Sequence, residues 1–418
     1  MATFFIVVAS LAVALLLHRW FKRPSVKHIK GPPSLSFWLG HERVLHNQDN
    51  AGDLETKWRR EYGTLFRIGG CFGFAILRLS NMFSTPHILT LNRRMPSSYW
   101  VSSPVGVLAL LIILNPAFSP AQLRISQVIF QQCSDKLVNG IKESFTGTDD
   151  TVNIRDWTGK VTLDIIASFR YDFSTLDGQK TELGQAMRHL FTASQANPSA
   201  LELILVAMIR VLPDSALGLL RLVPTREIRQ LINVGNMAKK TARQIMASHN
   251  EVQTPEGNGD LLNILARARS AGKMQDDEIE AQLMTLIIAG HETSGTSLTW
   301  LLYELAVHSE YQSIIRAELN QSNEYDSMPF LNAVIKESLR LHPVVHSLMR
   351  TAPHDDIIPL SGGKTLTIPK GQTLLCSAYL YNRLPCHCLW GDDAEEWNPA
   401  RFLDKTLPVS MGVYAKLE

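Results

Sequence analysis

The chain has 418 residues, of which 45% are hydrophobic and 19% are charged, so it carries enough apolar side chains for a large buried core and long disorder is excluded. Its 41 basic and 39 acidic side chains give a formal net charge of +2, and no dense lysine or arginine block occurs, which argues against a nucleic-acid partner. The five cysteines are too few and too scattered for a disulfide framework, which favours a reducing compartment.

The N-terminus opens with a long apolar segment. The twenty residues from Ala2 to Phe21 would span about 30 Å as a helix, which is the thickness of a hydrocarbon core. Within it, residues 4–17 are all apolar or small, and the basic residues follow that run while none precedes it, unlike the arrangement in a cleavable signal peptide. We therefore expect residues 1–23 to form a single-pass transmembrane helix with the body in the cytosol, and residues 24–33, with Pro32 and Pro33, to form a stiff basic, proline-rich hinge.

Residues 34–418 are expected to form one domain, because no internal repeat or low-complexity linker interrupts them. A helix should end at Gly63, and a hairpin should follow over residues 64–79. Apolar spacing typical of helices dominates from about residue 121 to 308, and short strands, including 365–369 and 373–379, follow Pro343. Helices with strands near both ends of the body predict an α+β fold.

Two apolar segments are open to more than one interpretation. Residues 201–223 contain only four charged residues and are broken by Pro213, so they form either a pair of core helices or a surface element that dips into a bilayer. Residues 104–114 are too short to span a membrane, and we expect a buried element there.

A long helix is predicted from Asp276 to His308, and its apolar pattern is interrupted by the hexapeptide A-G-H-E-T-S at 289–294. Gly290 and Thr293 are three residues apart and share a face, so a missing side chain would lie beside a hydroxyl group. Such a gap would admit a diatomic ligand. Taken alone, the hexapeptide is also explained by a helix kinked at glycine and threonine, with Glu292 facing solvent.

Two further motifs follow along the chain. In K-E-S-L-R-L-H-P, Glu337 and Arg340 are spaced for an i,i+3 ion pair, and Pro343 ends the helix. In W-N-P-A-R-F, Arg401 lies in a proline-turned segment and can join that pair. If buried, such a charge network needs a partner for every member.

An A-G-x-E-T helix, then E-x-x-R before L-H-P, then N-P-x-R-F, in this order, resembles the cytochrome P-450 family of microsomal haem-thiolate monooxygenases. The resemblance covers roughly residues 31–416 and implies a mainly helical fold with a small β-sheet region. It also implies roles at the haem: a proton relay to dioxygen, a contact with the bound group, a structural triad and a propionate partner. By this resemblance Thr293 and Glu292 would form the proton relay, and Gly290 would contact the bound group. Glu337, Arg340 and Arg401 would form the structural triad, and Arg350 would pair with a propionate.

The resemblance further implies an activity. The expected reaction is the hydroxylation or oxidation of a lipophilic small molecule by dioxygen, with haem b as the cofactor and with NADPH-derived electrons delivered by a reductase. The expected location is the endoplasmic reticulum membrane. Among members of the family, the sequence resembles fungal enzymes of secondary metabolism, so terpenoids are a candidate substrate class.

The sequence departs from the family at two segments that hold the haem. The family's iron-ligating cysteine lies in an F-x-x-G-x-R-x-C-x-G loop after N-P-x-R-F, and the 418 residues contain no such loop, so no metal ligand is assigned. Residues 101–122 contain no Trp, His, Arg or Lys to contact the second propionate. Cys386-His387-Cys388 does not make a zinc site, because adjacent side chains diverge and no second ligand cluster completes it. A non-catalytic, truncated relative and an incomplete reading of a longer gene are therefore alternative hypotheses.

Overall fold

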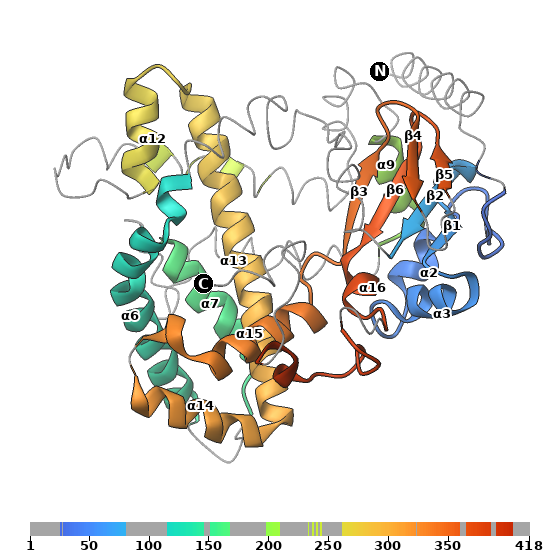
Figure 1. Cartoon of the computed structure of the whole chain (residues 1–418). Helices are drawn as coiled ribbons and strands as arrows, with labels where there is room; N and C mark the ends of the chain where they lie inside the picture. Colours follow the sequence, from blue (N-terminus) through green and yellow to red (C-terminus); the bar gives the residue numbers. More distant parts are fainter. Residues whose placement is uncertain are drawn as a thin grey trace. The chain divides into compact units, whose positions relative to one another are not determined.

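The computed structural model describes residues 26, 28–80, 115–145, 151–167, 198–209, 261–322, 324–359, 365–385 and 390–403, with single positions between 233 and 244 (Figure 1). The chain divides into two compact units, one made of residues 1–95, 196–212 and 300–418 and the other of residues 96–195 and 213–299. The apolar N-terminal segment and residues 104–114 lie outside the described residues. Among the helices that are described, none combines the length and the apolar character needed to cross a membrane.

The first unit contains a four-stranded sheet in the order β1-β2-β6-β3. The predicted hairpin is present as β1 (Leu65–Gly69) and β2 (Ala75–Leu79), which pair antiparallel. Strand β2 pairs parallel with β6 (Thr373–Ser377), and β6 pairs antiparallel with β3 (Ser347–Thr351), so the blue and orange strands of Figure 1 form one sheet. A separate antiparallel pair is formed by β4 (Asp356–Pro359) and β5 (Thr365–Ile368).

Short helices accompany this sheet. Helix α3 (Asp53–Tyr62) ends as predicted at Gly63, whose φ of 91° suits a residue without a side chain. Its Trp58 packs in one buried cluster with Phe66 and Leu380. The strand expected over 373–379 stops at Ser377, because the Ser377 hydroxyl caps the Leu380 N–H and begins α16. The remaining elements here are α2 (Glu42–His46), η1 (Cys71–Gly73), α9 (Ala200–Ile209) and α16 (Ala378–Asn382).

A second cluster of the same unit lies among its C-terminal helices. Ile315, Val334, Leu341 and Trp397 are buried together there. They come from α14 (Ser309–Gln321), from α15 (Pro329–Leu341) and from the segment that precedes η6 (Pro399–Phe402), and η4 (Tyr325–Ser327) connects the two helices. This packing places the two predicted motifs around residues 337 and 401 beside each other.

The other unit is helical in its described part, with η2 (Asn115–Phe118), α6 (Pro120–Ser144), α7 (Ile154–Ala167) and α12 (Leu261–Ser270). It also holds most of α13 (Asp276–Val307), which has 32 residues and closely matches the predicted long helix. Helix α6 begins where Ser119 accepts a hydrogen bond from the Gln122 N–H and Pro120 takes the first helical position.

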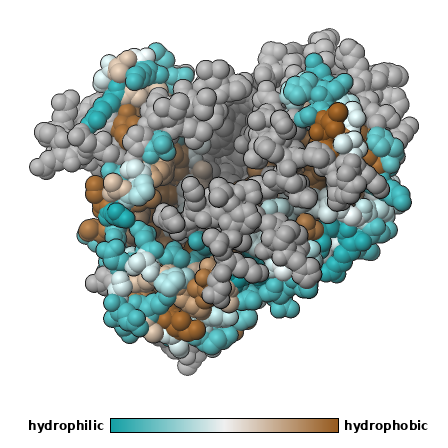
Figure 2. Space-filling view, in the orientation of Figure 1, coloured by the Kyte–Doolittle hydropathy of each residue, from teal (hydrophilic) through white to brown (hydrophobic). Residues whose placement is uncertain are grey.

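Most of the surface drawn for the described residues in Figure 2 is hydrophilic, with apolar residues in separate patches. The described residues form many helices and a few strands, which confirms the predicted mainly helical fold with a small sheet region.

Candidate functional site

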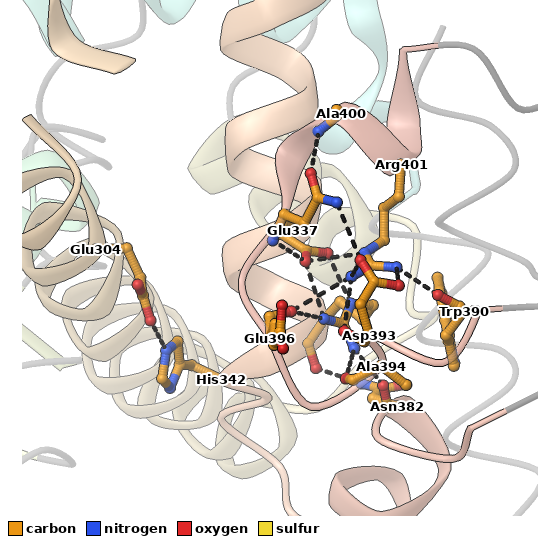
Figure 3. Close-up of polar contacts among 12 residues, drawn as sticks. Glu304, Glu337, His342, Asn382, Trp390, Asp393, Ala394, Glu396, Ala400 and Arg401 are labelled. Carbon is orange, nitrogen blue, oxygen red and sulfur yellow. Dashed lines mark hydrogen bonds and ion pairs between the residues drawn. The ribbon is translucent and has the colours of Figure 1, made fainter. Parts of the chain in front are cut away.

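A buried carboxylate joins two buried arginines at the C-terminal end of α15 (Figure 3). Glu337 and Arg340 have no exposed side-chain surface. Arg340 Nε donates to Glu337 Oε2 at 2.6 Å and its Nη2 donates to Oε1 at 2.9 Å, which is the two-pronged geometry that suits guanidinium and carboxylate groups. Arg401 Nε, from η6, donates to Glu337 Oε1 at 2.9 Å. The structure thus brings together the three residues that the sequence placed in a structural triad.

The other donors of these arginines reach the surrounding main chain and one further carboxylate. Arg340 also donates to the carbonyl oxygens of Ala394 at 2.7 Å and of Asn382. Arg401 Nη2 donates to Asp393 Oδ2 at 3.0 Å. We call Glu337, Arg340, Asp393 and Arg401 the Glu337 network. Its two positive and two negative charges balance, which is the condition for a stable buried charge cluster.

The Glu337 network shifts the pKa values of two of its own members, Arg401 and Asp393. Burial lowers the pKa of Arg401, but Glu337 and Asp393 outweigh it and hold that pKa above its usual value. Burial raises the pKa of Asp393, but hydrogen bonds from Asn398 and Arg401 outweigh it and bring that pKa below its usual value. Arg401 and Asp393 are therefore both charged at neutral pH.

A second polar contact lies near this network and had no signal in the sequence motifs. Glu304 Oε1 of α13 lies 2.5 Å from His342 Nε2, and the His342 ring stacks on Trp300 with the ring centroids 4.1 Å apart. Glu304 Oε2 also lies 3.5 Å from His308 Nε2. Trp300 and Glu304 are four residues apart and share one face of α13, and His308 follows the last residue of that helix. No group of His, Cys, Asp or Glu within the described ranges is arranged to hold a metal ion.

In the other unit, α13 carries the predicted hexapeptide. Thr293 is exposed, and its Oγ1 donates to Ala289 O of the preceding turn at 2.5 Å. Glu292 Oε1 lies 3.6 Å from Arg155 Nη2 of α7. A Cβ atom on Gly290 would lie 2.6 Å from Ile166 Cδ1, so the bare side of Gly290 faces α7. The structure therefore places Gly290 at a helix contact and Thr293 on an open face, and their roles at dioxygen stay predictions.

A buried histidine fixes this part of α13 to α7. His291 is 3% exposed, and its Nδ1 lies 3.2 Å from Thr162 Oγ1, which also lies 3.1 Å from His291 O. A Cβ atom on Gly295 would meet the same hydroxyl at 3.1 Å. Small residues and one hydroxyl thus allow the two helices a close approach at the turn that bears Glu292 and Thr293. The sequence analysis did not assign His291, although it stands within the quoted hexapeptide.

Arg350 lies on β3 of the first unit, opposite Leu374 of β6. It is half-buried, and the one acceptor that the described residues offer it is the Met349 carbonyl oxygen, 3.0 Å from Nη1. Within the described part of the chain no other hydrogen bond engages this guanidinium, a group that pairs readily with a carboxylate.

Comparison with known proteins decides the family, since a model of the cytochrome P450 family matches residues 112–412. The chain belongs to the cytochrome P450 family. Cytochrome P450 monooxygenase 205 of Postia placenta is 28% identical over 446 residues, which cover 94% of this chain and 81% of the relative. Cytochrome P450 monooxygenase claQ of Ampulloclitocybe clavipes is 28% identical over 443 residues, which cover 93% of this chain and 79% of the relative. By its family this P450 is an oxidoreductase of the haem monooxygenase type.

A haem needs a cation for its propionates and a ligand for its iron. The Arg350 guanidinium suits a propionate. The iron ligand in the family is a thiolate, which requires a deprotonated sulfur facing the cofactor. Cys376 is fully buried in β6, and burial raises its pKa to about 11. Cys71 and Cys133 are buried as well, so none of these three cysteines fits the role, and Cys386 and Cys388 lie outside the described residues.

Proposed function

We propose that this P450 oxidises a lipophilic small molecule, as part of fungal-type secondary metabolism with terpenoids as a candidate class. The electrons would come from NADPH through a reductase partner. The observation that carries the proposal is the arrangement on α13: His291 fastens the helix to α7, while the neighbouring Thr293 stays exposed and Glu292 lies beside Arg155. Polar groups of this kind on a well-packed helix suit proton delivery to a bound oxidant.

Glu292 and Thr293 are suited to hold and pass a proton. The Glu292 side chain is 27% exposed and its Oε1 lies 3.6 Å from Arg155 Nη2, so the carboxylate is in contact with solvent and has a cation beside it. Thr293 uses its own hydrogen for the Ala289 carbonyl, which leaves its oxygen lone pairs free to accept one. The proposed relay uses both groups, each at its own position on α13.

The proposed location is the endoplasmic reticulum membrane, with a single N-terminal span and the body facing the cytosol. The apolar segment of residues 1–17 and the basic residues that follow it, among them Arg19, Lys22 and Arg23, support this orientation. A lipophilic substrate fits an enzyme that is tethered to a lipid phase.

A spectrum tests the cofactor and a variant tests the relay. The expressed, reduced chain treated with carbon monoxide should show the Soret band of a thiolate-ligated haem. With reductase and NADPH, Thr293→Ala should lower product formation by about 10²-fold and divert electrons to hydrogen peroxide. Ser294→Ala, the exposed neighbour, should leave both rates unchanged. Equal product yields in the two variants would count against the relay.

A non-catalytic relative is the second candidate, because the three described cysteines are all buried. In that case the folded chain would bind lipophilic molecules without showing a Soret band. The same spectrum, recorded beside a ligand-binding assay on one preparation, separates the two candidates.

A further inference from the structure

Arg383 of the first unit is a half-buried cation that lacks an acceptor. It directly follows α16, and its main-chain N–H donates to Leu380 O at 3.3 Å. Its side-chain Nη1 is closed off from solvent, yet no residue that the structure describes accepts a hydrogen bond from it. A buried N–H group without an acceptor is costly, and more so when it carries charge. The position of Arg383 therefore calls for a partner.

The charge of Arg383 cannot be removed to relieve this cost. Burial is the largest influence on its pKa and lowers it, but an arginine side chain stays protonated in proteins. The Tyr379 ring compensates in part, since the guanidinium carbon lies 3.8 Å from the ring centroid. Stacking of this kind engages the flat face of the guanidinium. The N–H groups at its edge, Nη1 among them, still need an acceptor in their plane.

The two carboxylates that act on Arg383 are both engaged elsewhere. Glu395 and Glu304 raise the pKa of Arg383, against the effect of burial. Glu395 accepts from Arg59 Nη2 at 3.1 Å and from Arg60 Nη2 at 2.8 Å, and Glu304 contacts two histidines. Three guanidinium groups thus share the charge of Glu395, which leaves a surplus of positive charge beside α16.

The guanidinium of Arg383 is held in place by a fixed frame. Tyr379 packs against the buried cluster between α3 and the sheet, and a Cβ atom on Gly52, at the start of α3, would lie 2.3 Å from Tyr379 Cε1. On the other side of the chain, Asn382 Nδ2 donates to Arg340 O at 2.9 Å and Arg340 Nη1 donates to Asn382 O. A group that is mounted in this way loses little freedom when it captures a ligand.

We propose that Arg383 is the anchor of a binding site for a small oxyanion, a phosphate or a carboxylate group, where α16 meets α3. Both groups present paired oxygen atoms that match the edge of a guanidinium. Such a ligand would satisfy Nη1 and neutralise the surplus charge. The residues that build the site all belong to the first unit, and the site is independent of the proposed oxidation and of any haem.

Thermal unfolding of the full chain in a neutral detergent tests the site, with inorganic phosphate as the probe. Millimolar phosphate replaces chloride at constant ionic strength, so that screening stays equal and the concentration is too low for a general salting effect. A ligand that binds only the folded chain raises the unfolding midpoint with the logarithm of its concentration. We expect this rise with phosphate.

A parallel series with acetate distinguishes the two ligand groups. A rise with either anion supports the oxyanion site, and the anion with the larger effect names the group that the site prefers. If neither anion raises the midpoint above its value in chloride, the proposal is overturned, and Arg383 Nη1 then holds only water.

Variants show whether the anion binds at Arg383. Arg383→Gln should weaken phosphate binding by about ten-fold or more, because hydrogen bonds from a charged donor are lost. Its midpoint in chloride should be no lower than that of the wild type, since an unpaired charge is removed. Arg60→Gln, which removes a 64% exposed guanidinium nearby, should respond to phosphate as the wild type does, and Tyr379→Phe, which keeps the ring, should as well. Equal responses of the wild type and Arg383→Gln would reveal a general salt effect and overturn the proposal.

Phosphorus NMR of inorganic phosphate gives a readout that needs only the wild-type chain and one milder variant. The phosphate signal should broaden when the wild-type chain is added and should sharpen again when sulfate competes for the site. Arg383→Lys keeps the charge but not the two-pronged edge, so it should broaden the signal less. A signal that stays sharp with the wild-type chain, or that broadens equally with Arg383→Lys and is not reversed by sulfate, would contradict the site.

Discussion

Glu337 neutralises two buried guanidinium groups, so its negative charge should contribute more to the free energy of unfolding than its ability to accept hydrogen bonds. In Glu337→Gln, Arg340 and Arg401 would remain buried with only Asp393 to balance them. Removing one partner of a buried ion pair typically costs about 3–5 kcal/mol, so we expect a loss of that size in the free energy of unfolding. Asp276→Asn, which removes the carboxylate of the exposed pair with Arg269, should cost at most about 1 kcal/mol. Denaturant unfolding of both variants checks this, and equal losses would contradict it.

Asp393 gives the Glu337 network a dependence on pH. Its pKa is below the usual value in the folded chain, so between the unfolded value near pH 4 and the lower folded value the unfolded state binds more protons. The stabilisation is therefore complete above about pH 4 and is lost as the pH falls through the folded pKa. Because this side chain is 35% exposed, the effect should be at most about 1 kcal/mol.

The comparison that reveals the Asp393 effect is with Asp393→Asn, which cannot titrate. The difference in unfolding midpoint between this variant and the wild type should be largest at about pH 6 and should shrink toward about pH 3. A difference that stays constant over that range would show that the pKa of Asp393 is not lowered by folding.

At the scale of elements, α7 and α13 approach each other closely because glycine residues lie at their contact. A Cβ atom on Gly295 would lie 3.1 Å from Thr162 Oγ1 and 3.5 Å from Gly159 Cα, so valine there must push the helices apart. We expect Gly295→Val to lower the free energy of unfolding by about 1–3 kcal/mol. Ser294→Val puts the same side chain on the exposed neighbour and should change it by less than about 0.5 kcal/mol. Thermal unfolding of the two variants measures this, and equal midpoints would argue against close packing at Gly295.

The elements also show which features a sequence reveals. Ser119-Pro120 and Gly63 mark helix ends through local chemistry, and the structure has those ends. The main-chain acceptors of Arg340, at Asn382 and Ala394, could not be predicted, because every residue carries a carbonyl group and only the fold selects which ones converge. Likewise, nothing in the L-H-P motif showed that His342 would meet Glu304.

At the scale of the whole molecule, the sheet joins the two ends of the described chain. Leu77 of β2 pairs with Leu374 of β6, and such a distant parallel pairing has no local signature. The same sheet core buries Val26 and Ile29, which the sequence analysis had placed in a hinge. The fold therefore begins before the predicted hinge ends, and Val26 lies on the folded side of the border with the predicted membrane span.

That border predicts how two deletions will differ. Under the proposed anchoring, removing residues 1–23 should release the chain from membranes and leave the unfolding midpoint unchanged, because Val26 and Ile29 keep their places in the core. Removing residues 1–30 takes both side chains away, and each buried aliphatic side chain contributes about 1.5–3 kcal/mol, so the loss should be about 3–6 kcal/mol. Flotation and denaturant unfolding of the two proteins measure the two effects separately. Equal stability would mean that residues 24–30 are a free linker and that Val26 and Ile29 do not contribute to the core of the sheet.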